Sequence, residues 1–273
     1  MDKTPLIQGE KADETPTVQE GQSSSVENNE LVSEMMNLGV FYGQSKSRTN
    51  PKMRKYILAN RSGFSVINLE KTIVKLEATK KLIKEVTAKR EKVMVVGTSP
   101  AVRGAVKQLG EELDLPYVTE RWLGGTLTNF DTISKRIKHL KKLKEEQKNN
   151  AWDKYTKKEK LDKERELNKL DKLFGGIEDL EKPPGLLIVA DTTNNESATR
   201  EARALDIPVI GLLNTDADPA WVDIGIPAND KNIKSVEFLL DQIKDMIKEG
   251  IKTAPAPKVE EEGEKENKKK EKK

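Results

Sequence analysis

The chain has 273 residues, which is enough for one sizeable domain with appendages or for two small domains. Charged residues make up 35% of it, aromatic residues 4%, and there is no cysteine, so disulfides, thiolate metal sites and thiol catalysis are excluded while the net charge of +3 indicates no partner by itself. No apolar run approaches the roughly eighteen residues of a membrane helix, and the polar start lacks the regions of a signal peptide, so we expect a soluble cytoplasmic protein.

The two ends of the chain are polar. Residues 1–30 carry seven Asp and Glu against two lysines, and they include three consecutive serines. Residues 251–273 contain two prolines and then alternate Glu with Lys. Neither segment has enough apolar side chains to form a core, so we predict disordered tails at 1–30 and 251–273.

Between these ends the hydrophobic pattern alternates between strand and helix. Apolar runs predict strands, and apolar residues three or four positions apart predict helices. In chain order these are strands 56–59 and 64–67, a helix after the cap Asn68, strand 93–96, a helix beginning at Ser99-Pro100, strands 116–118 and 186–189, helix 195–205, strands 208–212 and 224–226, and helix 232–249. Repeated strand–helix units favour an α/β fold, a doubly wound sandwich around a mainly parallel sheet, over 31–127 and 175–250.

Residues 128–174 interrupt this alternation with two helical stripes. The first consists of Ile133, Ile137, Leu140 and Leu143, and the second of Leu161, Leu167, Leu170 and Phe174. Thr128 with Asp131 and Thr156 with Glu159 have the spacing of capping boxes, and Asn149-Asn150 separates the two stripes. We predict an inserted antiparallel coiled-coil hairpin that ends at Gly175-Gly176.

The sequence offers little support for an enzyme. No glycine-rich dinucleotide or P-loop motif follows a predicted strand. Gly97-Thr98-Ser99 lies at a strand end where backbone amides could hold a phosphate, but a permissive glycine and an N-cap serine explain it better. Asp191, Asp216 and Asp218 follow strands and could bind Mg²⁺, although aspartate also favours turns. His139, the only histidine, lies in the charged hairpin, where we expect it to be solvated or to face RNA. We therefore expect no catalysis, no metal and no cofactor.

Binding to a polyanion has better support. Residues 46–55 hold five cations and no acid, together with polar side chains that donate hydrogen bonds to phosphate. The first hairpin helix is also basic, although the flanks of coiled coils are normally rich in lysine. The candidate RNA-binding residues are Lys46, Arg48, Asn50, Lys52, Arg54, Lys55, Arg61, Arg103, Arg121, Lys135, Arg136, Lys138, Lys141 and Lys142.

The segment Arg121–Phe130 joins a predicted strand to the hairpin. Trp122 could stack on a base, but beside Leu123 and two glycines we expect it to wedge the hairpin against the sheet. The predicted junction residues are Trp122, Leu123, Gly124, Gly125, Asn129, Gly175 and Gly176.

Several strings resemble one known family. These are RWLGGTLTNF at 121–130, NPKM at 50–53, GGI at 175–177, LNTDADP at 213–219 and VMVVGTSPAVRGAV at 93–106. They resemble the second protein of the small ribosomal subunit in its bacterial form, over roughly 31–250. The resemblance implies a flavodoxin-like sandwich with a protruding coiled coil. It also implies a non-enzymatic protein that binds small-subunit rRNA between head and body and helps to recruit the large ribosomal protein that captures mRNA.

The chain departs from that family in two places. One is Asp206, just before Ile207-Pro208, where the family more often has Gly or a polar or basic residue. The other is a string near the start of the domain. The family usually has the letters GVHFGH where this chain has Gly39-Val40-Phe41-Tyr42-Gly43-Gln44, so both histidines are missing. We expect neighbouring small-subunit proteins and rRNA as partners, with no membrane and no small-molecule substrate. The alternatives are an enzyme that binds a sugar phosphate or nucleotide at Gly97–Ser99 and Asp191, and a coiled-coil adaptor that contacts only proteins.

Overall fold

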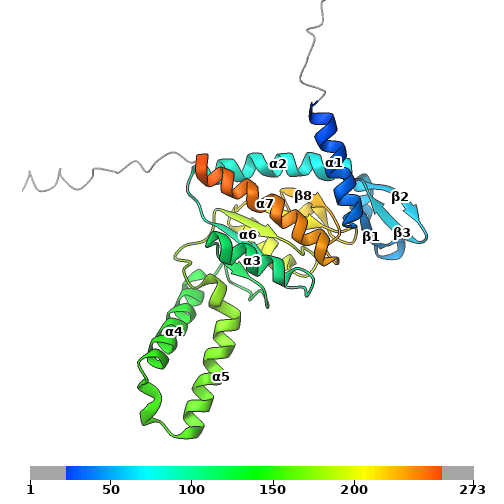
Figure 1. Ribbon diagram of the computed structural model, residues 1–273. Helices are drawn as coiled ribbons and strands as arrows, with labels where there is room; N and C mark the ends of the chain where they lie inside the picture. Colours follow the sequence, from blue (N-terminus) through cyan, green and yellow to red (C-terminus); the bar gives the residue numbers. More distant parts are fainter. Residues whose placement is uncertain (1–22, 254–273) are drawn as a thin grey trace, which may run out of the picture.

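The computed structural model describes residues 23–253. The predicted tails therefore lie outside the described residues, except for 23–30 and 251–253. The described chain consists of a large parallel sheet covered by helices, a small antiparallel sheet at one side, and a pair of helices that extends away from both (Figure 1).

The large sheet has five parallel strands. These are β4 (Val93–Val96), β5 (Tyr117–Val118), β6 (Leu186–Val189), β7 (Val209–Leu213) and β8 (Ile224–Pro227). They lie in the spatial order β5-β4-β6-β7-β8. Numbered by their sequence order within this sheet, this is the flavodoxin-like order 2-1-3-4-5. The predicted α/β class and parallel sheet are confirmed.

Helices cover both faces of this sheet, so its strands are apolar at every position. Val93 and Val95 belong to a core cluster with α2 (Leu69–Ala88), α3 (Arg103–Leu113) and α7 (Ile233–Thr253). Met94 and Val96 point to the opposite face and pack in a second cluster with α6 (Glu196–Ala204). Asn68 caps α2 as predicted, since its side chain accepts hydrogen bonds from the backbone of Glu70 and Lys71.

The small sheet has three antiparallel strands in the order β1-β3-β2. These are β1 (Tyr42–Ser45), β2 (Ile57–Arg61) and β3 (Phe64–Ile67). Ser62 and Gly63, with φ of 49° and 84°, form the tight turn of the predicted hairpin. Two 3₁₀ segments, η1 (Lys46–Arg48) and η2 (Pro51–Tyr56), connect β1 to β2.

Two helices, α4 (Phe130–Lys148) and α5 (Lys157–Phe174), form the extension, which we call the arm (Figure 1). They are joined by η3 (Ala151–Lys154) and followed by η4 (Gly175–Ile177). The predicted stripe of α4 is buried, but Leu161 of α5 is 46% exposed. The buried ring of Trp152 belongs to the same cluster as that stripe. This cluster also contains Met94 and Val96 of the parallel sheet. The capping box of Thr156 and Glu159 is present.

Three local predictions are wrong. Helix α1 (Ser23–Asn37) begins inside the predicted tail 1–30, because Met35 at its end is fully buried in the core. Helix α3 starts at Arg103 rather than at Ser99, whose hydroxyl is buried without a partner. Thr128 forms no capping box with Asp131, because its amide and hydroxyl both donate to Glu201.

Candidate nucleic-acid interface

The basic segment 46–55 is held rigidly at the carboxyl-terminal edge of the parallel sheet. Pro51 begins η2, and the Asn50 side chain caps it by accepting from the Lys52 amide at 3.0 Å. The Asn50 amide donates to the Thr215 carbonyl at 2.8 Å. Met53 is fully buried and belongs to the same apolar cluster as Leu213, the last residue of β7. The NPKM string therefore anchors the basic segment: Asn50 caps η2, Pro51 begins it, and Met53 buries an apolar side chain.

The anchor leaves a set of cations directed toward solvent. These side chains are exposed and make no hydrogen bond or ion pair within the part of the chain that the structure describes; they are Lys46, Arg48, Arg54, Lys55 and Arg61. Lys46 and Arg54 line a cleft of about 420 Å³ together with Leu58 and Asn60. Lys55 also lies over the Tyr56 ring, at 5.0 Å from its centroid. None of these cations has to break an internal hydrogen bond or ion pair to bind phosphate, and the backbone that carries them is already ordered.

Lys52 and Arg103, two of the predicted RNA-binding residues, contact other groups of the protein itself. Lys52 Nζ lies 2.7 Å from Asp218, and this hydrogen bond lowers the pKa of Asp218. An exposed ion pair contributes at most about 1 kcal/mol, so phosphate could displace it. Arg103 donates from Nε to the Thr98 carbonyl at 2.7 Å and lies 3.4 Å from Glu120. Arg103 therefore stabilises the loop after β4.

The arm divides its basic residues in the same way. Lys135, Arg136 and Lys138 are exposed and have no ion pair among the described residues, and neither has Arg121 at the junction. Lys141, in contrast, lies 3.1 Å from Asp179. Lys142 pairs weakly with Glu146, at 4.0 Å. The free cations of α4 are thus concentrated near its start, close to the sheet.

His139 is not simply solvated. Its Nε2 lies 3.0 Å from the Glu166 carboxylate on α5, so it joins the two helices of the arm. This contact between the helices indicates a structural role for His139.

The junction string is organised around one carboxylate, Glu201 of α6. It accepts hydrogen bonds from Trp122 Nε1 at 3.0 Å and from the amides of Gly125 at 2.8 Å and Leu127 at 3.0 Å. The amide and hydroxyl of Thr128 donate to it at 3.3 Å. Burial acts to raise the pKa of Glu201, but these donors outweigh it and lower the pKa overall. Trp122 is buried, belongs to the cluster that contains Met94 of the sheet and Ile133 of α4, and donates to α6, so its ring is not exposed for stacking on a base.

The junction glycines are not equivalent. Gly125 has φ of +87°, a conformation that favours glycine, and a side chain on Gly176 would collide with the backbone of Tyr117. A Cβ on Gly124 would meet nothing within 4 Å. Leu123 packs against the core cluster that contains Met94 and Val96. The Asn129 side chain accepts a hydrogen bond from the Thr132 hydroxyl and caps no backbone amide of α4.

The edge where doubly wound folds bind ligands is filled by the protein itself. Between β4 and β6, the switch point of the sheet, the fully buried Asp191 carboxylate accepts from the amides of Ser99 at 2.7 Å and Thr98 at 3.2 Å. Asn195 donates to it from the other side. Burial raises the pKa of Asp191 against the effect of these hydrogen bonds. A phosphate at Gly97–Ser99 would have to displace this carboxylate, which removes the main support for the phosphate-binding alternative.

The three aspartates predicted as possible magnesium ligands do not converge. Asp191 is tied to the loop after β4, and Asp218 to Lys52 and the Ala220 amide. Asp216 lines one cleft together with Asp218, and burial together with the charge of Asp230 raises its pKa. Among residues 23–253, no group of three or more His, Cys, Asp or Glu side chains is arranged to hold a metal ion.

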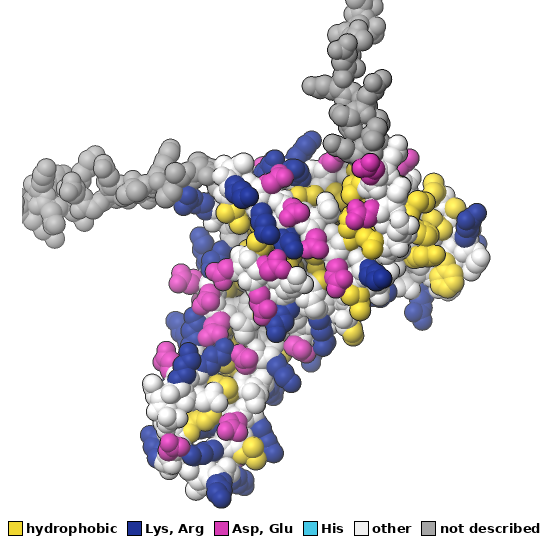
Figure 2. Space-filling model, viewed as in Figure 1, with side chains coloured by type: hydrophobic (Ala, Val, Ile, Leu, Met, Phe, Trp, Pro, Cys, Tyr) yellow, Lys and Arg dark blue, Asp and Glu magenta, His cyan; other side chains and the backbone are white. Residues whose placement is uncertain are grey.

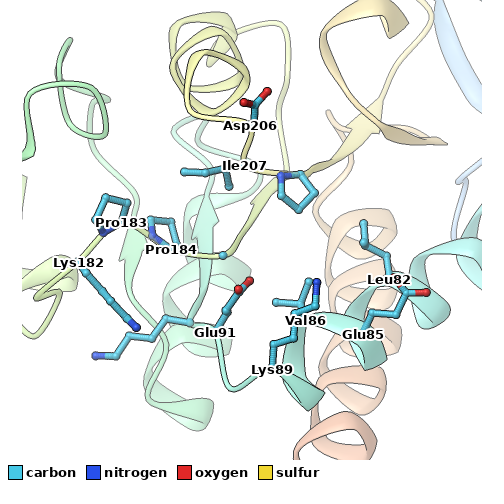
Figure 3. A pocket seen from close by; sticks show the side chains of 13 residues that line it. Leu82, Glu85, Val86, Lys89, Glu91, Lys182, Pro183, Pro184, Asp206 and Ile207 are labelled. Atoms are coloured by element: carbon cyan, nitrogen blue, oxygen red, sulfur yellow. The ribbon is translucent and has the colours of Figure 1, made fainter.

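A hollow of about 430 Å³ lies at the opposite, amino-terminal edge of the sheet (Figure 3). Its floor is apolar, with Pro183, Pro184 and Ile207, and its rim carries both signs of charge, including Lys89 and Asp206. Ligands of doubly wound folds bind at the other edge, and the mixture of charges favours no particular ligand.

One comparison with known proteins identifies a family. The family model described as Ribosomal protein S2 matches residues 35–250, which is more than half of the chain. The match spans both sheets, the arm and the junction string. Within 23–253 the helices are all too short or too polar to cross a membrane.

Proposed function

The chain belongs to the ribosomal protein S2 family and is thus a structural protein of the small ribosomal subunit; from that premise we propose that it binds small-subunit rRNA through the basic segment 46–55 and the sheet-proximal half of α4. The observation that carries this is the set of exposed cations on the anchored segment that have no ion pair among the described residues.

The finer parts of the proposal follow the resemblance of the junction strings. We propose a bacterial-type protein that works on cytoplasmic ribosomes, between head and body of the subunit. There it supports assembly and the recruitment of the large mRNA-capturing ribosomal protein. The arm, 128–174, is proposed to be an antiparallel coiled-coil hairpin inserted into the α/β domain of 31–127 and 175–250. It is supported by the buried stripe of α4 and by the His139–Glu166 contact between the helices.

The test compares two variants with the same loss of charge. The first replaces Lys46, Arg48, Arg54 and Lys55 with alanine. The matched control replaces four exposed lysines of α2 and α7, namely Lys81, Lys234, Lys248 and Lys252. Binding to small subunits that lack this protein is measured by co-sedimentation across a range of salt concentrations.

We expect the first variant to bind far more weakly. Log affinity falls linearly with log salt, and each cation that neutralises a phosphate adds about 0.7–0.9 to the steepness of that line. Removing four such cations should therefore make the line markedly shallower, whereas the control should keep both affinity and slope. Equal binding by the two variants, or wild-type binding that does not change with salt, would refute the proposed interface.

A further inference from the structure

The outer face of the three-stranded sheet exposes two aromatic rings. Tyr42 and Phe64 are each 55% exposed, although the chain as a whole contains few aromatic residues. Figure 2 shows apolar side chains gathered over β1–β3, with Lys and Arg side chains at the outer end of this patch and Asp and Glu side chains on the side toward α1. Large exposed rings next to cations indicate a contact surface rather than ordinary surface.

The strand register places both rings on the same side. Tyr42 lies opposite Val66, while Ser45 and Arg61 lie opposite Phe64. Phe64 and Val66 are two positions apart on β3, so they share a face, and their directly opposed partners share it with them. Phe64 is two residues from the cross-strand partner of Tyr42, and the register of β1 shifts between Tyr42 and Ser45, so a bulge lies between the two rings on the β1 side.

The inner face of the same sheet cannot accommodate the rings. Ser65 and Ile67, which alternate with Phe64 and Val66, are each 1% exposed. The Ser65 hydroxyl is hydrogen-bonded to Asn60 at 3.1 Å and to Thr49 at 2.9 Å. The fixed inner face therefore directs Phe64 toward solvent. The Tyr42 ring packs against Phe41, with ring centroids 4.1 Å apart, and the rest of its surface is exposed.

The charge around the rings favours one kind of occupant. Residues 46–61 contain no Asp or Glu. Arg61 is the cross-strand neighbour of Phe64, and the Lys46 amide donates to the Gly63 carbonyl at 3.0 Å, which places Lys46 at the same turn. Two aromatic rings on a sheet face, bordered by cations, form the arrangement on which RNA-binding sheets stack successive unpaired bases.

We propose that this outer face binds unpaired nucleotides of RNA. One base stacks on Tyr42 and a neighbouring base on Phe64, while Arg61 and Lys46 contact the phosphates. The inference rests on the proposed function, since it names the kind of RNA that the basic region selects. Duplex RNA, whose bases are already stacked on each other, does not use the rings.

The test uses a fluorescein-labelled oligouridylate, whose bases are unstacked, and a labelled RNA duplex of the same length, with anisotropy measured on the full chain. Tyr42→Leu and Phe64→Leu keep an apolar side chain but remove the ring. Tyr42→Phe and Phe64→Tyr keep the ring and serve as matched controls. Thermal unfolding of each variant shows that the fold is intact.

We expect each leucine variant to bind the single strand roughly tenfold more weakly, with an unchanged salt slope and unchanged binding of the duplex. The ring-preserving variants should bind like the wild type. Single-strand binding that is equal in leucine and wild-type proteins would overturn the inference, and so would equal weakening for strand and duplex. Leucine variants that bind RNA normally but lose a ribosomal protein in reconstitution would show a protein-binding face instead.

Failure of this inference is distinguishable from failure of the proposed function. If the variant lacking Lys46, Arg48, Arg54 and Lys55 still loses subunit binding while the leucine variants bind normally, the basic segment binds rRNA without base stacking. If neither set of changes affects subunit binding, the proposed function fails as well.

Discussion

The carboxylate of Glu201 should be the side chain on which the junction between sheet and arm depends most strongly. Glu201→Gln keeps the size of the side chain but removes its charge. Glutamine can still accept from Trp122 Nε1 and the Gly125 amide through its oxygen. Its NH₂ group would then face the amides of Leu127 and Thr128, which are donors themselves.

The expected destabilisation follows from these hydrogen bonds. A hydrogen bond to a charged group contributes about 1.5–3 kcal/mol and a neutral one about 0.5–1.5 kcal/mol, while a buried donor without a partner costs about 1–3 kcal/mol. Because Glu201 is only half-buried, water offsets part of this, and we expect Glu201→Gln to lower the free energy of unfolding by about 2–3 kcal/mol. For a domain of this size the midpoint of thermal unfolding should fall by roughly 4–12 °C.

The destabilisation caused by Glu201→Gln should depend on pH. The pKa of Glu201 is lowered in the folded protein, so its stabilisation is present above the ordinary value of about 4.3 and is lost as the pH falls through the lowered value. Urea unfolding at neutral and acidic pH should show the gap between wild type and Glu201→Gln closing toward low pH.

A control on the same helix tests whether the effect belongs to the junction. Glu196 pairs only with exposed Arg200, at 2.6 Å, so Glu196→Gln should change stability by less than about 1 kcal/mol. The reasoning is wrong if the two glutamine variants are equally stable at neutral pH, or if the Glu201→Gln gap is independent of pH.

Asp191→Ala should lower the free energy of unfolding by about 3 kcal/mol, because it leaves the amides of 98–99 buried without an acceptor. Burial raises the pKa of Asp191, so its contribution is largest in acid and falls as the pH rises through the raised value. Urea unfolding should therefore show a larger gap to wild type in acid than at neutral pH; a gap that grows with pH would contradict this. Gly176→Ala should cost about 1–3 kcal/mol, since the added methyl group meets the Tyr117 backbone. Gly124→Ala, its matched control in open space, should leave the thermal unfolding midpoint unchanged within about 2 °C, and equal midpoints for the two variants would refute the distinction.

The α/β sheet could be predicted because its signals are local. The strands at 93–96 and 186–189 are continuous apolar runs, and Gly63 marks the tight turn between two further strands. The capping box at Thr156 is likewise contained within four residues. Helix α1 was missed because its sequence is polar and its burial depends on Met35, at its far end.

The organisation of the junction could not be predicted, because its centre is distant in sequence. The string at 121–130 is distinctive, but Glu201, which binds it, lies on another helix and has no motif of its own. The same limit applies to Lys52 and Lys141, whose ion-pair partners Asp218 and Asp179 come from elsewhere in the chain. Composition shows where cations are plentiful, but only the fold shows which of them have partners.

The carboxyl-terminal edge of the parallel sheet explains why an enzyme-like fold here serves as a binding scaffold. In doubly wound enzymes this edge is open to a ligand. Here the Asp191 carboxylate accepts hydrogen bonds from the backbone amides of the loop after β4, and Met53 of η2 packs beside the end of β7. Thr215, which follows β7, accepts from the backbone of both Asn50 and Gln44. The groups that would hold a substrate thus hold the protein's own basic segment and small sheet, so the surface that we propose to bind RNA is built directly on the core.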